Sequence, residues 1–323
     1  MLFRVEQIER ILHSRNLSVA AFVLMLVMGY VSQLFHPGNA VMTLEGTAVK
    51  LTVGEGSATI AYLAGIASIS LIAVLTSLLH KHFLFITGLT SFYATFLFCF
   101  SAAIPALSGE AGHLLPALVS LGCCMILFSC YEDRTSTSRV FMTFTILSAF
   151  SLVEYAFMAY IALFVVGVVQ MRIFSLRTFL AILFGIITPY WIVLGFGIVS
   201  PYDITFPHLE SAVGHIWSEN NHFILAAVLL IGIVTPIANS FNLLKLKLQL
   251  RAYNGFFIMQ FISSTAMIFI DYSRYLDYAM TPIVCTAVFL AQYFTMSGLR
   301  RKYIVMLAVL LAAIAASIIG IIR

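Results

Sequence analysis

Charge is what this sequence has least of. Only 9% of its 323 residues are Asp, Glu, Lys or Arg, whereas a soluble globular domain carries about 25%. Hydrophobic residues make up 62% of the chain, and its mean hydropathy is +1.04. A water-soluble fold of this length could not hide so much apolar surface. The composition therefore predicts a polytopic membrane protein, and it excludes a nucleic-acid-binding protein because no soluble domain carries a basic face.

Sequence motifs for metals, disulfides and nucleotides are also missing. The five cysteines all lie in apolar runs, and no CxxC pair occurs among them. This pattern favours buried small side chains over a disulfide framework or a zinc site. No P-loop, Rossmann glycine pattern or GxSxG is present either. We therefore expect no metal, no cofactor and no nucleotide-driven motor.

Long apolar runs dominate what remains. An N-terminal charged segment precedes the first run, which we interpret as an uncleaved first span because it is too long for a signal peptide. No linker divides the chain, so we expect one all-α domain over residues 1–323, a transmembrane helical bundle. The runs predict eleven spans, at about 18–36, 57–79, 83–106, 112–131, 139–153, 154–170, 178–200, 222–244, 255–271, 276–297 and 303–322.

The number of spans depends on one stretch of the chain, 140–170. Its 31 residues are too long for one comfortable crossing and short for two. If the stretch turns back at Val153–Glu154, 14 of the basic residues fall on one side of the membrane and 3 on the other. If it crosses once, the division is 8 against 9. The positive-inside rule therefore predicts a short helical hairpin at 139–170, a cytoplasmic N-terminus and an external C-terminus.

Glu154 falls at the apex of this hairpin. Each arm of about 15 residues reaches roughly 22 Å, less than the hydrocarbon thickness of about 30 Å. A carboxylate in an outward-opening recess would be costly unless paired, solvated or protonated, which makes Glu154 a candidate catalytic acid or base. The alternative is that longer turns lift Glu154 to the interface, where it only marks a loop.

The predicted outer segments carry nine acidic residues and five of the eight histidines. The outer loop 201–221 contains His208 and His215, which would share one face of a short helix. Imidazoles and carboxylates this close together are able to bind a metal, but their spacing matches no known motif. An ordinary polar loop is the simpler interpretation, so we assign no metal ligands.

A second outer turn runs from Asp271 to Asp277, with Arg274 three residues from each aspartate. One interpretation is a local, exposed ion pair of little energetic value. The other is an arginine that binds phosphate or carboxylate groups, for which its fork of donors is suited. Under the second interpretation the candidate substrate-binding residues are Tyr155, His208, His215, Asp271, Arg274 and Asp277.

Two segments carry a resemblance to a known family. They are residues 139–199, with Leu152-Val-Glu-Tyr155 and Gly185-Ile-Ile-Thr-Pro-Tyr190, and residues 271–302. Both resemble an uncharacterised family of bacterial multi-pass inner-membrane proteins, which implies that location. The short hairpin followed by a basic turn is also distantly similar to polytopic glycosyltransferases that use lipid-linked sugars. Those enzymes carry a catalytic acid early in the first outer loop, where this chain has only Glu45 and Glu55, far from its start.

Three functions are compatible with these features. The first is a non-enzymatic component of envelope biogenesis or assembly, whose partners are membrane lipids and assembly proteins. The second is a glycosyltransferase-like enzyme that acts on a lipid-linked glycan at the outer leaflet, with Glu154 as its acid or base. The third is a transporter, although the sequence has neither a chain of ionisable residues through the membrane nor paired half-length segments.

Overall fold

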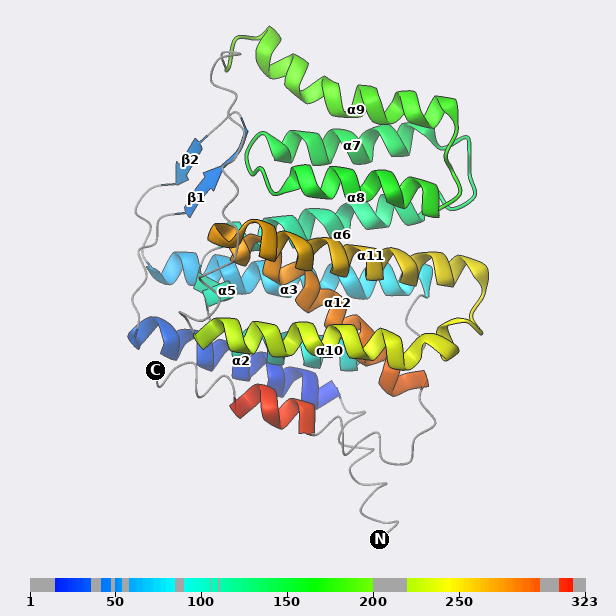
Figure 1. Cartoon of the computed structure of the whole chain (residues 1–323). Coiled ribbons are helices and arrows are strands. Elements are labelled where there is room, and N and C mark those ends of the chain that lie inside the picture. Colours follow the sequence, from blue (N-terminus) through cyan, green and yellow to red (C-terminus); the bar gives the residue numbers. More distant parts are fainter. Residues whose placement is uncertain are drawn as a thin grey trace.

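The computed structural model describes residues 15–35, 42–47, 50–53, 58–84, 90–104, 106–109, 111–199, 220–296 and 308–315. Most of these residues are helical, and the long helices pack side by side (Figure 1). The elements are α2 (Arg15–Phe35), β1 (Met42–Glu45), β2 (Lys50–Val53), α3 (Ala58–Phe83), α4 (Thr90–Ala103), α5 (Ala106–Gly109), η1 (Ala111–Leu114), α6 (Leu115–Phe128), α7 (Thr137–Ser151), α8 (Phe157–Gln170), α9 (Leu176–Gly195), α10 (Asn220–Leu243), α11 (Leu248–Ile270), η3 (Tyr272–Arg274) and α12 (Tyr275–Met296).

Five of the described helices are long and apolar enough to cross a membrane. They cover Thr59–Phe83, Leu176–Gly195, Phe223–Leu243, Leu248–Ile270 and Tyr272–Met296. Shorter apolar helices of 10–17 residues add to the bundle. The structure therefore confirms a helical chain with membrane-compatible helices, as its composition predicts.

Helix α12 forms the centre of the bundle. Nearly its whole length is buried, and it packs against α4, α6, α10 and α11. Helix α9 lies at the periphery, where it packs against α7 and leaves side chains such as Phe184 and Trp191 exposed. Such an apolar outer surface suits contact with lipid.

Two regions differ from the sequence-based prediction. Residues 42–45 and 50–53, expected in an outer loop, pair as an antiparallel hairpin that joins Met42 to Val53 and Glu45 to Lys50. Helices α4 and α6 have 14 residues each, shorter than the spans predicted there. Pro116 lies in the first turn of α6, a position that suits proline and marks where this helix begins.

Charge differs between the two ends of the bundle. The α8–α9 and α10–α11 connections lie at the right-hand end in Figure 1 and carry Arg172, Lys245 and Lys247. We call this the basic end. The β1–β2 pair, the α7–α8 turn and η3 lie at the left-hand end, which we call the hairpin end. Three buried carboxylates occur here, those of Glu154, Asp271 and Asp277.

Candidate functional site

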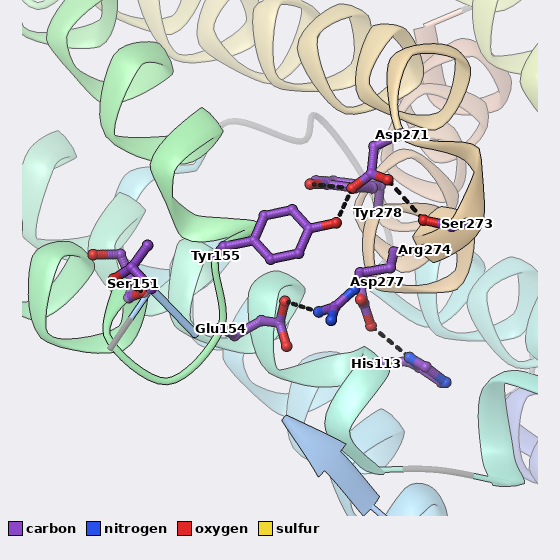
Figure 2. A network of polar contacts seen from close by, with 10 residues as sticks. His113, Ser151, Glu154, Tyr155, Asp271, Ser273, Arg274, Asp277 and Tyr278 are labelled. Atoms are coloured by element: carbon purple, nitrogen blue, oxygen red, sulfur yellow. Dashed lines mark hydrogen bonds and ion pairs between the residues drawn. The ribbon is translucent and has the colours of Figure 1, made fainter. Parts of the chain in front are cut away.

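Three segments that are distant in sequence meet at the hairpin end of the bundle. They are the α7–α8 turn at residues 152–156, the short helix η1, and the turn from Asp271 into the start of α12. Figure 2 shows their polar side chains pointing toward one another. We call this group the polar cluster; its members are His113, Glu154, Tyr155, Asp271, Ser273, Arg274, Asp277 and Tyr278.

The Glu154–Arg274 ion pair joins the α7–α8 turn to the turn before α12. A guanidinium nitrogen of Arg274 donates to Oε1 of Glu154 at 2.9 Å, across 120 residues of sequence. The side chains are only 3% and 17% exposed, so solvent screens this pair far less than a surface pair. The guanidinium carbon of Arg274 also lies 4.5 Å from the ring centre of Tyr155. This cation–π contact helps to orient the guanidinium group toward Glu154.

Asp271 is the hydrogen-bond acceptor at the centre of the cluster. It directly follows α11 and is 0% exposed. One of its carboxylate oxygens accepts from the hydroxyls of Tyr155 and, at 3.5 Å, Tyr278, and the other accepts from Ser273 at 3.0 Å. These bonds provide the partners that a buried carboxylate requires.

His113 and Asp277 form the third contact of the cluster. Nδ1 of the histidine lies 2.5 Å from a carboxylate oxygen of Asp277. Asp277 belongs to the first turn of α12, where the helix dipole stabilises a negative charge. This contact ties η1 to the central helix.

The cluster contains more acidic than basic groups. Of its three buried carboxylates, Glu154 contacts the guanidinium of Arg274 and Asp277 contacts the imidazole of His113, while Asp271 accepts from hydroxyl groups. Burial raises the pKa of Glu154 from its ordinary value of 4.5 to about 7; the charge of Asp277 adds to this shift and Arg274 opposes it. Burial and the hydrogen bond to Asp271 also raise the pKa of Tyr155, which keeps this phenol protonated as a donor.

The raised pKa of Glu154 predicts the pH dependence of stability. The folded protein holds this proton more tightly than the unfolded chain, so the free energy of unfolding should fall as pH rises from about 4.5 toward 7. The slope from one group is at most about 1.4 kcal/mol per pH unit. Thermal unfolding in detergent from pH 5 to pH 8 measures it. Glu154→Gln should flatten the curve in this range, and an unchanged curve would contradict the assignment.

The structure brings together five of the residues that the sequence singled out, namely Glu154, Tyr155, Asp271, Arg274 and Asp277. The other two, His208 and His215, lie outside the described residues. Sequence reasoning did not select His113, Ser273 or Tyr278. His113 has one signal in the sequence, since it is one of the five histidines of the predicted outer segments, but nothing in the neighbouring sequence indicates Asp277 as its partner.

The arrangement is that of a helical membrane protein with an acidic polar cluster at one end of its bundle. Chemically, Glu154 is suited to exchange a proton near neutral pH beside a fixed guanidinium. Among the described residues, no group of three His, Cys, Asp or Glu side chains is placed to hold a metal ion. Neither a protein-family model nor a curated protein or solved structure matches the chain.

Proposed function

We propose that the chain is a multi-pass protein of the bacterial inner membrane, with eleven spans, a cytoplasmic N-terminus and an external C-terminus. The distribution of charge supports this orientation. The connections at the basic end carry Arg172, Lys245 and Lys247, whereas buried carboxylates gather at the hairpin end. By the positive-inside rule the basic end faces the cytoplasm, so the polar cluster lies toward the outer face.

Within that membrane, we propose a non-enzymatic role as a component of envelope biogenesis or assembly. The observation that carries this proposal is the use of the cluster's polar groups in contacts within the chain. Glu154 pairs with Arg274, Asp271 accepts three hydroxyl groups, and Asp277 contacts His113. These contacts fix the α7–α8 turn and η1 against the central helices. Such a fixed arrangement suits a scaffold for membrane lipids and assembly proteins.

An enzyme acting on a lipid-linked glycan or phospholipid at the outer leaflet is the second candidate. The observation that favours it is Glu154, a buried carboxyl with a raised pKa held 2.9 Å from Arg274. Strongly perturbed carboxyls beside a specific partner are typical of general acids and bases. In this role Glu154 would transfer the proton, and Arg274 would bind the phosphate.

Glu154→Gln distinguishes the two proposals. The amide keeps the size and a hydrogen-bond acceptor of the carboxylate but cannot exchange a proton. In a strain that depends on this protein for envelope integrity, a non-enzymatic component should retain function within about twofold at equal protein level. An enzyme should lose activity about 10²–10⁴-fold, the usual contribution of general acid–base catalysis. Such a loss would contradict the non-enzymatic proposal.

The matched control is Glu132→Gln. Glu132 also pairs with an arginine, Arg172, but both side chains are more than half exposed and lie at the basic end. Both proposals expect this variant to behave as the unmodified protein.

A further inference from the structure

The turn between α10 and α11, at the basic end, exposes basic and apolar side chains in alternation. Its sequence alternates leucine with lysine from Leu244 to Leu248. Lys245 and Lys247 are exposed, and so are the two leucines, at 63% and 44%. Arg251, also exposed, lies one helical turn further on, where its backbone N–H donates to the carbonyl oxygen of Lys247 at 3.0 Å. The turn thus presents three cations beside exposed apolar side chains.

The acidic groups near this turn have other partners. The sequence contains no Asp or Glu from residue 220 to residue 270. Of the described residues at the basic end, the acids are Glu132 and Asp133. Glu132 pairs with Arg172, and Asp133 accepts from the backbone N–H and the hydroxyl of Thr135 at 3.0 and 2.6 Å. Among the described residues no carboxylate forms an ion pair with the three cations of the turn, so their charge is available to an external partner.

The exposed apolar residues of the turn continue the outer face of α10. Ile237 and Phe241 are 67% and 78% exposed, and with Leu244 they are spaced by four and three residues, so the three share one helix face. Helix α10 is long and apolar enough to cross a membrane, and Lys245 comes directly after it. A lysine at such a position can lay its apolar stem along the hydrocarbon while its ammonium group reaches the headgroups. The turn therefore suits the depth at which lipid headgroups lie.

We infer that the α10–α11 turn is a binding surface for anionic phospholipids. Lys245, Lys247 and Arg251 supply positive charge for the headgroup, and Leu244 and Leu248 supply apolar contact for its acyl chains. An acidic soluble protein would match only the charges, whereas a lipid matches both the charges and the apolar residues between them. The inference deepens the proposed scaffold role by naming a lipid class, and it rests on the proposed location in a membrane.

Native mass spectrometry of the full-length protein in mixed micelles tests this surface. Phosphatidylglycerol or phosphatidylethanolamine with the same acyl chains is added, and the bound lipids are counted as the lipid concentration rises. The unmodified protein should bind phosphatidylglycerol about tenfold or more tightly than phosphatidylethanolamine. Lys245→Gln combined with Lys247→Gln should weaken phosphatidylglycerol binding about tenfold or more, because each lysine near an anionic headgroup contributes about fivefold in affinity. Binding of phosphatidylethanolamine should change little.

The matched control is Arg134→Gln combined with Arg139→Gln. Both arginines are exposed and their replacement removes the same charge, but Glu132 and Asp133 precede them in the chain. This variant should bind phosphatidylglycerol within about twofold of the unmodified protein. Equal weakening by the two double variants, or equal binding of the two lipids, would overturn the inference. These results concern lipid binding alone, whereas Glu154→Gln tests the non-enzymatic role, so the two proposals fail by different outcomes.

Discussion

Replacing Arg274 with glutamine should destabilise the protein by about 3–5 kcal/mol, the usual cost of removing one partner from a buried ion pair. The substitution leaves Glu154, which is 3% exposed, without its cation, in a cluster that also holds Asp271 and Asp277. It removes the cation–π contact with Tyr155 as well. Denaturant unfolding in mixed micelles, followed by tryptophan fluorescence and far-UV circular dichroism, measures the loss.

Arg172→Gln is the control for this prediction. Arg172 pairs with Glu132 at 3.5 Å, and these side chains are 57% and 53% exposed. Exposed pairs contribute at most about 1 kcal/mol, so this variant should unfold almost as the unmodified protein does. If Arg274→Gln were as mild as Arg172→Gln, the cluster would not hold the hairpin end together.

Asp271→Ala, which removes the carboxylate, should give the second large effect. It should lower the free energy of unfolding by about 2–5 kcal/mol. The carboxylate oxygens accept from the hydroxyls of Tyr155 and Tyr278, whose side chains are buried. A buried donor left without a partner costs about 1–3 kcal/mol, and the variant leaves two. The same unfolding assay measures this change.

Two milder variants bracket the Asp271 result. Ser273→Ala removes only one donor to Asp271, and this donor belongs to an exposed residue, so the loss should stay below about 1 kcal/mol. Asp271→Asn keeps one acceptor oxygen, so its loss of stability should lie between those of Ser273→Ala and Asp271→Ala. An Asp271→Ala protein as stable as Ser273→Ala would show that the phenols find other partners, which would remove Asp271 from the centre of the cluster.

Much of the architecture is predictable because burial in a membrane constrains composition so strongly. Helices long and apolar enough to cross follow from apolar runs alone, and the structure has them. The structure also has a turn at residues 152–156, in the stretch where the balance of basic residues favoured one. Glu154 stood out because a carboxylate is rare in such a stretch. Each of these features depends on a short stretch of sequence or on a count of residues along the chain.

Contacts between distant segments are what the sequence did not reveal. Arg274 has aspartates three residues away on both sides, so the sequence suggests a local ion pair as one interpretation, yet the structure pairs Arg274 with Glu154 across 120 residues. The β1–β2 pair is short and lies in a region that reads as an ordinary loop. Gly46 lies against the backbone of Leu152, which is adjacent to it only after folding.

The most direct test of the account is a double-mutant cycle on Glu154 and Arg274. We expect Glu154→Gln alone to be mild, because the cluster has an excess of carboxylates, and to rescue much of the stability lost in Arg274→Gln. The coupling energy at pH 8 should be about 2 kcal/mol or more, within the range found for residues in one buried network. A coupling energy near zero would show that the 2.9 Å contact does not join the α7–α8 turn to the central helices, and would overturn the role of this ion pair.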